Sequence, residues 1–463
     1  MALWLAAAAS DNLWPMPELG PIPAVVFDRA TQTPGAGGDV SSLIAPPYDV
    51  LDEGPKRQLL AGDAHNIVAI DLPFTPPKVV GPEAVYAQAG ATYRSWLASG
   101  VLVRRPRPAV YVYQQTFTHG GKTFHRRGLI ANLRVQEFGP TPGGRGGLWP
   151  HEQTFAGGKE DRLKLMRACQ AQLSPIFGLY RDPDHRVGRL LQGVIENQQR
   201  MCAGTTANDG VLHSLWEVSE PQMMAALTES IAGGDVYIAD GHHRYHTALN
   251  YRNELAAKTA LAPDHPANFC LFVLVAMEDP GMIVLPTHRV LGGMHGFSMA
   301  ALVKASAGRL KIKPWSGGDL QALAQALPQA GPHAVGLVTA GGGEALAMAI
   351  ATPVERDPLA ARFAQRAPAW RLLDVAIVQH LIMEEICQKA FYPAGTPPMW
   401  KFPHELEQLS EYLLSDGFQL GLVLQPTPLK AVMDVSQAGE LMPQKSTFFY
   451  PKLATGLVIN PLE

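Results

Sequence analysis

The sequence has little cysteine and little charge. Its four cysteines (Cys169, Cys202, Cys270 and Cys387) lie far apart and form no CxxC pair, which argues against a disulfide framework and indicates buried or free thiols in a reducing compartment. Charged residues make up 17% of the chain, against a usual value of about 25%. The net charge is −3 and no basic tract is present, so neither nucleic acid nor a membrane surface is expected as a partner.

The N-terminal apolar run, residues 3–9, is short and has no Lys or Arg before it. It is too short to span a membrane, and a secretory signal normally begins with positive charge. The sequence therefore predicts a cytoplasmic protein.

Common nucleotide and catalytic motifs are also missing. The sequence contains no GxxxxGK[ST], no GxGxxG after a strand, no GxSxG elbow and no kinase HRD and DFG set. If the protein handles nucleotides, it does so outside the folds that carry those motifs.

Glycine and proline are abundant, with 44 and 39 residues, which is typical of a globular protein with many loops and turns. Helical and extended patterns alternate irregularly and include hairpins, so the predicted fold class is α+β rather than a doubly wound sheet. The pattern predicts a strand over residues 66–72, a buried strand over 236–239 and a helix over 242–260.

The clearest candidate site follows that buried strand and consists of Asp240, Gly241, His242, His243 and Arg244. Glycine permits a tight turn from strand to helix, and the helix N-terminus then offers unpaired N–H groups and a positive dipole end to an anion. The His and Arg side chains add cationic donors, and the Asp carboxylate suits orienting a His or holding magnesium through water. A phosphate-binding turn is predicted. The alternative, a capping Asp beside surface histidines, is disfavoured because four titratable residues surround one glycine.

His242 and His246 are also spaced to share one helix face as zinc ligands. No third ligand is evident in the sequence, and Arg244 between them would repel a cation. A zinc site is therefore not favoured.

A second candidate site is His151 and Glu152. It begins like the HExxH zinc motif, but Phe155 replaces the second His, so a zinc protease is excluded. A carboxylate beside a histidine suits a general base that acts on a hydroxyl. Glu160 and Asp161, which follow, are equally compatible with an exposed helical turn.

Two further polar clusters supply candidate substrate-binding residues. Lys445, Ser446 and Thr447 follow a proline and suit binding of a phosphate or carboxylate, although an amphipathic strand explains them equally well. His288 and Arg289 follow an apolar stretch and are plausible as a wall of the same site.

Taken together, these motifs resemble the DUF1015 family. The resemblance rests on Asp-Gly-His-His-Arg at residues 240–244, Ala-Pro-Pro-Tyr-Asp-Val at 45–50, Leu-Pro-Thr-His-Arg at 285–289 and Met-Pro-Gln-Lys-Ser-Thr at 442–447. It covers nearly the whole chain, but the family is largely uncharacterised and implies little function by itself.

The pattern is also similar to the ParB/sulfiredoxin-like superfamily, which places a phosphate-binding motif at the same strand-to-helix turn. Within it, the ADP-dependent free-serine kinase has a Pro-His-Glu-Gln motif similar to residues 150–153 and the same Asp-Gly-His-His-Arg turn. Its Pro-Lys-Thr-Thr segment is similar to residues 443–447, with one residue inserted and Ser446 in place of a Thr. This chain is much longer, with extra residues before His151 and between Glu152 and Asp240.

The resemblance implies a phosphotransferase that uses ADP or ATP, with Mg²⁺, to phosphorylate the hydroxyl of free L-serine or a similar small compound. Glu152 would be the catalytic base, and the turn would hold the nucleotide phosphates. The implied catalytic residues are His151, Glu152, Asp240 and His242, and the implied substrate-binding residues are His288, Arg289, Lys445, Ser446 and Thr447. Glu152, Arg244 and Thr447 are expected to converge.

The resemblance also implies a ParB/sulfiredoxin-like mixed-sheet core with α+β insertions. The expected parts are an N-terminal α+β region (residues 1–120), the core with the turn (121–290), a small α+β domain (291–390) and a C-terminal segment that completes the site (391–463).

Two other functions use a similar turn. A ParB-like regulator binds or hydrolyses a nucleotide without kinase activity, although the net charge of −3 does not favour DNA-contacting helices. Sulfiredoxin-like chemistry needs a reactive Cys in the turn, where this chain has His242 and His243.

Overall fold

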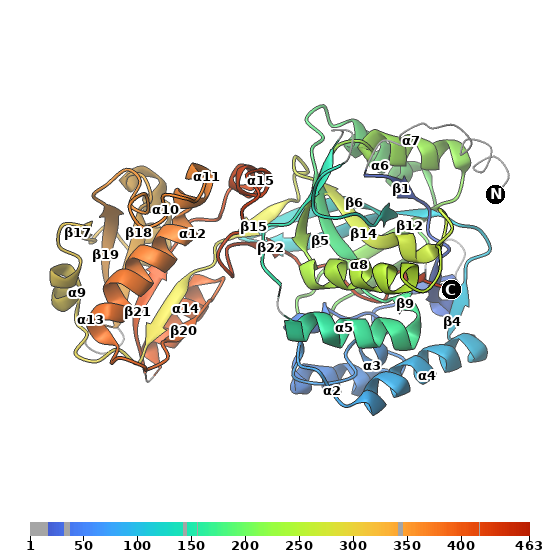
Figure 1. Ribbon diagram of the computed structural model, residues 1–463, viewed down its shortest axis with the longest axis horizontal. Helices are drawn as coiled ribbons and strands as arrows, with labels where there is room; N and C mark the ends of the chain where they lie inside the picture. Colours follow the sequence, from blue (N-terminus) through green and yellow to red (C-terminus); the bar gives the residue numbers. More distant parts are fainter. Residues whose placement is uncertain (1–16, 32–37, 142–145, 155, 341–345, 416) are drawn as a thin grey trace. The chain divides into compact units, whose positions relative to one another are not determined.

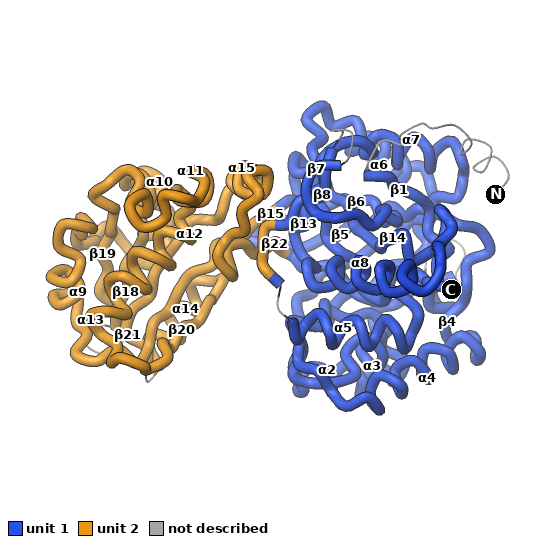
Figure 2. Tube along the Cα trace, in the orientation of Figure 1, with its two compact units in different colours: residues 1–150, 154–282, 451–463 blue, residues 151–153, 283–450 orange. Residues whose placement is uncertain are grey.

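The computed structural model describes residues 17–31, 38–141, 146–154, 156–340, 346–415 and 417–463. The chain forms two compact units (Figure 2). Unit 1 comprises residues 1–150, 154–282 and 451–463, and unit 2 comprises residues 151–153 and 283–450. Each unit therefore combines segments that are far apart in the sequence.

Unit 1 is built on one large mixed sheet (Figure 1). In spatial order the strands are β3 (Gly38–Asp39), β11 (Cys202–Thr205), β12 (Leu212–Val218), β5 (Val110–His119), β6 (Lys122–Arg134), β14 (Phe269–Ala276), β10 (Ile176–Tyr180), β13 (Asp235–Asp240), β8 (Gly147–Trp149) and β7 (Gly139–Pro140), with β1 (Leu19–Gly20) paired to β6. The pairs β10–β14, β13–β8 and β11–β3 are parallel, and the other neighbouring strands are antiparallel. This mixed sheet confirms the predicted α+β class.

Helices and two short ladders complete unit 1. The ladders pair β2 (Val25–Phe27) with β4 (Leu102–Arg104) and β9 (Ala171–Gln172) with β23 (Asn460–Pro461). The helices are α2 (Glu53–Gly62), α3 (Val68–Asp71), α4 (Glu83–Ser99), α5 (Ala156–Cys169), α6 (Arg186–Asn197), α7 (Pro221–Ile231) and α8 (His242–Ala256), with short helical turns η1 (Asp28–Thr31), η2 (Tyr48–Val50) and η3 (Pro266–Asn268).

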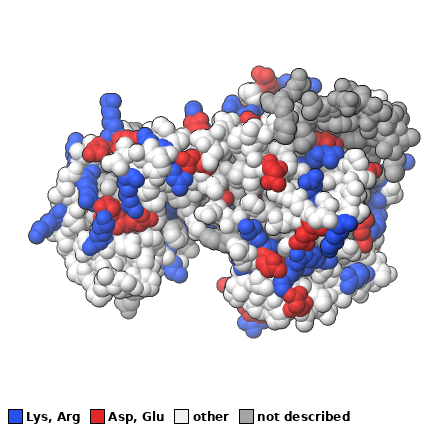
Figure 3. Space-filling model, viewed as in Figure 1, with Lys and Arg blue, Asp and Glu red and all other residues white. Residues whose placement is uncertain are grey.

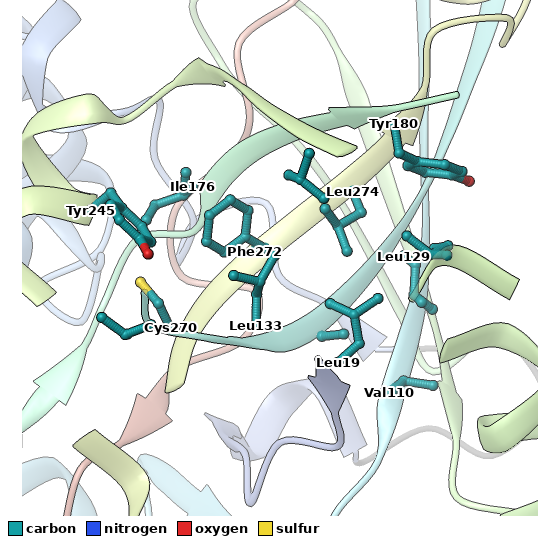
Figure 4. Close-up of a cluster of buried hydrophobic side chains, with 14 of the residues drawn as sticks. Leu19, Val110, Leu129, Leu133, Ile176, Tyr180, Tyr245, Cys270, Phe272 and Leu274 are labelled. Atoms are coloured by element: carbon teal, nitrogen blue, oxygen red, sulfur yellow. The ribbon is translucent and has the colours of Figure 1, made fainter. Parts of the chain in front are cut away.

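One face of this sheet carries the core of unit 1. Alternate residues of a strand point to the same face, and Cys270 and Phe272 of β14 share a buried cluster with side chains of α6, α7 and α8. Figure 4 shows Tyr245 of α8 beside Ile176 and Cys270. The Tyr245 hydroxyl donates to the carbonyl of Gln136 (2.6 Å) and accepts from its N–H (2.8 Å). The helix that begins at the candidate turn is thereby fixed to the sheet.

Unit 2 contains an antiparallel sheet with helices on both faces. Leu337 and Leu422 pack with α12 and η4 on one face, whereas Val338 and Val423 pack with α10 and α14 on the other. The strands are β17 (Leu310–Pro314), β19 (Leu346–Pro353), β18 (Val335–Ala340), β21 (Phe418–Val423), β16 (Arg289–Gly292) and β20 (Met399–Lys401), and a separate ladder pairs β15 (Ile283–Leu285) with β22 (Phe448–Tyr450). The helices are α9 (Met299–Ala305), α10 (Leu320–Ala330), α11 (Pro368–Arg371), α12 (Asp374–Ile377), the π-helical η4 (Val378–Gln388), α13 (Lys389–Phe391), α14 (Leu406–Leu414) and α15 (Leu429–Gln437).

The two units differ from the four parts expected from the sequence. β5 and β6 pair along their length across residue 120, so no boundary lies there. Residues 291–390 are only a portion of unit 2. The expected C-terminal segment is divided at residue 450, because residues 451–463 belong to unit 1, where β23 pairs with β9.

The strand predicted over residues 66–72 is wrong, because Val68–Asp71 forms helix α3. The Asn66 side-chain oxygen accepts from the N–H of Val68 (3.1 Å), and its amide donates to the carbonyls of Ser42 and Ile44. These bonds start a buried helical turn. A short apolar run that is buried on all sides has no periodicity to distinguish helix from strand.

The surface and the cysteines agree with the composition. All four cysteines are buried and unpaired. On the face shown in Figure 3, positive and negative side chains are interspersed with broad uncharged areas on each unit. Among the helices of the described residues, none has both the length and the apolar character needed to cross a bilayer.

Replacing Tyr245 by Phe is expected to lower the free energy of unfolding by about 1–3 kcal/mol, because the N–H and carbonyl of Gln136 lose their buried partner. Urea denaturation of the full chain measures the change. Tyr93→Phe is the matched control, since the Tyr93 hydroxyl is buried without a hydrogen-bond partner in the described part of the chain and its removal should cost nothing. Equal losses in the two variants would contradict the role given to Tyr245.

Candidate functional site

The predicted strand–turn–helix unit is present in unit 1. Asp240 ends β13, Gly241 forms the turn, and α8 begins at His242. Gly241 has φ of 92°, and a Cβ there would lie 3.1 Å from the guanidinium of Arg244. A side chain is therefore disfavoured at this position both by the backbone conformation and by the neighbouring group.

Arg244 folds back over this turn. Its guanidinium donates to the carbonyl of Pro175 and to the carboxylate of Asp240 (3.3 Å). These two bonds hold a positive charge at the N-terminal end of α8, where the helix dipole is also positive. The turn is therefore preorganised for an anion.

Two lysines that the sequence did not assign to the turn also act on Asp240. The ammonium of Lys452 lies 3.7 Å from the Asp240 carboxylate, and that of Lys78 lies 3.0 Å from Asp49. Burial by itself would raise the pKa of Asp240, but Lys452, Arg244 and Lys78 outweigh it and the pKa is lowered. Asp240 is consequently ionised at neutral pH in a mainly cationic environment.

His243 and His246 contribute hydrogen-bonding groups rather than charge. His243 packs against α5, where a Cβ on Gly158 would lie 2.9 Å from its ring. Burial lowers the pKa of His243 to about 4, with Lys78 adding to the effect. Burial, with Lys159, also lowers the pKa of His246. The expectation that His243 adds positive charge is corrected: it is neutral at pH 7, and the lysines supply the charge.

His242 is buried at 4% exposure. Among the described residues, no group of three or more His, Cys, Asp or Glu side chains is arranged to hold a metal ion.

A buried ionic network lies behind the turn. The guanidinium of Arg162 contacts the carboxylates of Asp161 (2.8 Å) and Asp71 (3.4 Å) and stacks on the ring of Tyr48 at 3.9 Å. Asp161 also accepts a hydrogen bond from Tyr86 (2.8 Å). Asp161 is therefore a buried partner of Arg162 and not part of an exposed turn. Tyr48 and its neighbour Asp49 tie the Ala-Pro-Pro-Tyr-Asp-Val motif to the surroundings of the turn.

Unit 2 brings together the second and third candidate segments. The carbonyl of His151 accepts from the N–H of Met442 (2.8 Å), and Glu152 pairs with Met442 in a parallel β-bridge. The His151 imidazole contacts the hydroxyl of Thr447 at 3.0 Å. Residues 296 positions apart therefore lie side by side, and the predicted approach of Glu152 to Thr447 stays a prediction. The predicted approach of Arg244 concerns a residue of unit 1 and stays a prediction.

His288 and Arg289 are interior residues of unit 2. Arg289 has 0% exposure and donates to the carbonyls of Thr287 (2.6 Å) and Lys445 (3.0 Å). The His288 ring accepts from the N–H of Leu424 (3.1 Å). Burial lowers the pKa of His288 to about 3 and that of Arg289 to about 9. Contrary to the expected substrate contact, these side chains fix the main chain beside the site.

The segment held by Arg289 is a tight turn. Lys445 has φ of 57°, and its side chain is exposed. Ser446 is buried, with its hydroxyl donating to the carbonyl of Pro443 and its carbonyl accepting from Thr427 (2.7 Å). Of the three predicted residues here, Lys445 and Thr447 present polar groups, whereas the Ser446 hydroxyl bonds within the turn.

Comparisons with known proteins identify the family. The DUF1015 model, described as a protein of unknown function, matches residues 23–376, and the chain belongs to this family. No curated protein matches the chain.

Solved structures show only remote likeness. A free serine kinase variant in complex with ADP is 11% identical over 65% of this chain and 83% of that chain, with a TM-score of 0.31. SbnI with a C-terminal truncation, from Staphylococcus aureus, is 12% identical over 68% and 84%, with a TM-score of 0.30. A conserved hypothetical protein from Pyrococcus furiosus is 14% identical over 66% and 88%, with a TM-score of 0.29. At these scores the likenesses do not by themselves establish a shared fold or activity.

Acidification is expected to destabilise the chain through His243. Its folded-state pKa of about 4 lies below an unfolded value of about 6.5. The unfolded chain therefore binds the proton first, and the free energy of unfolding falls as the pH drops from about 6.5 toward 4. His243→Gln should remove part of this pH dependence. Another part should remain in that variant, because the buried His213 also has a pKa lowered by burial, to about 3.

Urea denaturation at a series of pH values between 7 and 4 checks this expectation. His185→Asn is the matched control, since His185 is exposed in a left-handed conformation (φ 52°) that Asn tolerates. The same pH dependence in His243→Gln, the control and the wild type would contradict the neutral state of His243.

Proposed function

We propose that this DUF1015-family chain is a nucleotide-dependent kinase of a small hydroxy compound, with free L-serine as the expected acceptor and O-phosphoserine as the product. The observation that carries the proposal is the turn at Asp240–Gly241–His242, where an ionised carboxylate and a helix N-terminus are surrounded by cations. That arrangement fits the phosphates of ADP or ATP.

The cationic turn supports the phosphate-binding half of the proposal. Phosphoryl transfer depends mainly on positioning and charge stabilisation, because the protein does little covalent chemistry itself. Arg244 and the N–H groups at the start of α8 would contact the donor phosphates. Neutral His243 would serve as a hydrogen-bonding group, since its pKa is lowered to about 4 by burial.

The His151–Thr447 contact supports the acceptor half. Glu152 would accept the proton of the substrate hydroxyl as its oxygen bonds to the terminal phosphorus of the donor. The bond from that phosphorus to the bridging oxygen then breaks, and the nucleotide leaves one phosphate shorter. Exposed Lys445 and the Thr447 hydroxyl would hold the carboxylate of the acceptor or the new phosphate. His151, through its contact with Thr447, would orient that hydroxyl.

Magnesium fits this site as a companion of the nucleotide. Mg²⁺ is usually bound through one or two carboxylates together with substrate phosphates, and Asp240 is the carboxylate at the turn. The ion would supply neutralisation of phosphate charge, and Asp240 would be its protein ligand.

The alternative function, a ParB-like regulator without kinase activity, differs in its response to the acceptor. Nucleotide consumption by such a regulator would be indifferent to serine. A coupled assay with ADP or ATP, run with and without serine, separates the two functions, and mass spectrometry across a panel of amino acids identifies the acceptor.

Glu152→Gln is expected to lower turnover by about 10²–10⁴-fold, because a general base contributes rate acceleration of that size. Its affinity for the nucleotide should stay within twofold of wild type in calorimetric titration, since the phosphate-binding groups are unchanged. Glu160→Gln is the matched control: Glu160 is exposed on α5, so its removal should leave turnover unaltered. A Glu152→Gln variant with wild-type turnover would overturn the assignment of the base.

A further inference from the structure

A cavity of about 250 Å³ borders helix α2 in unit 1, and no residue of the turn at 240–244 lines it. Small-ligand pockets usually hold about 300–1,000 Å³, so a cavity just below that range suits a single small organic group. Four lining residues recur at the spacing of one face of α2: Pro55, Gln58, Leu59 and Gly62. No residue of α2 is buried, so this helix face borders the cavity instead of a packed core.

The wall of the cavity formed by residues 41–66 is held by hydrogen bonds of its own. The side-chain amide of Asn66 donates to the carbonyls of Ser42 and Ile44, at 2.9 Å each. The Ser42 hydroxyl donates to the carboxylate of Asp63 (2.9 Å). Asn66 and Ser42 both line the cavity, so this part of the wall is fixed before any ligand arrives, which lowers the cost of binding.

The remaining lining combines apolar surface with two available amides. Pro46, Leu51 and Leu59 supply apolar groups, and none of the lining residues is charged. Gln58 and Asn208 are exposed at the rim, and within the described part of the chain neither side chain has a hydrogen-bond partner. Each amide offers both a donor and an acceptor. This lining suits an uncharged ring with polar edges, and it does not suit a phosphate.

The cavity and the turn are bordered by the same sequence motif, residues 45–50. Pro46 lines the cavity. Asp49 is paired with Lys78 at 3.0 Å, and the charge of Lys78 acts on Asp240. The motif Ala-Pro-Pro-Tyr-Asp-Val therefore contributes to the surroundings of both sites.

We infer that this cavity binds a nucleobase, with the ring against Leu51 and Leu59 and its polar edge toward the amides of Gln58 and Asn208. Adenine is the expected base, because Asn and Gln side chains match the donor and acceptor at its N6 and N7 positions. The base of the donor nucleotide and that of a separate nucleoside share this chemistry. The inference goes beyond the proposed function and does not require kinase activity at the turn.

Calorimetric titration of the full chain with adenosine, which has no phosphate, tests the inference. Leu59→Trp should weaken adenosine binding at least about 10-fold, because the indole occupies the cavity. Gln58→Leu removes the amide at similar size and should weaken binding about 2- to 10-fold, the value of one neutral hydrogen bond. The matched controls are Leu414→Trp, at an exposed position of α14, and Gln222→Leu, at an exposed position of α7, and both should bind as wild type does.

The inference is overturned if adenosine does not bind the wild type, or if either cavity variant binds it as tightly as wild type. Where both variants weaken binding, a titration in saturating ADP identifies the source of the base. Adenosine that still binds assigns the cavity to a separate nucleoside, and adenosine that no longer binds assigns it to the base of the donor nucleotide. The proposed function fails separately, if no acceptor is phosphorylated by a chain that binds adenosine in this cavity.

Discussion

The ionised carboxylate of Asp240 is the interaction on which the candidate site depends. Burial opposes its charge, and Lys452, Arg244 and Lys78 together keep it ionised. Removing one member of a buried charge network costs more than forming the pair gains, because the remaining charge is left uncompensated. The three cations belong to separate segments of the chain. Asp240 therefore has favourable charge interactions with the C-terminal segment, with helix α8 and with the loop before α4.

Two buried guanidiniums hold the main chain of the segment that follows α15 by donating to its carbonyls. Arg126 donates to the carbonyl of Pro451 in unit 1, and Arg289 donates to the carbonyl of Lys445 in unit 2. Burial lowers the pKa of Arg126 to about 10 and that of Arg289 to about 9, which leaves both charged at pH 7. In each case the bond to a carbonyl holds the main chain through a charge-assisted interaction.

The sequence predicts features that are encoded locally. The strand, Gly241 and the start of α8 are signalled by a buried run, a turn residue and a helical pattern in adjacent positions, and the structure has all three. The interior position of Arg289 and the neutral state of His243 could not be predicted, because burial depends on segments distant in the sequence. The approach of Lys452 to Asp240 could not be predicted either, because it depends on contacts with β5 and β6 that no local pattern encodes.

The distribution of these groups also bears on the choice between kinase and regulator. Asp240, Arg244 and Lys452 all belong to unit 1, so a protein that only binds a nucleotide needs nothing from residues 151–153. Yet His151 is hydrogen-bonded to Thr447, and Glu152 is paired with Met442. Pairing residues 151–152 with the segment of Met442 and Thr447 has a conformational cost. The proposed phosphoryl transfer assigns a role to Glu152 and Thr447, which nucleotide binding alone does not.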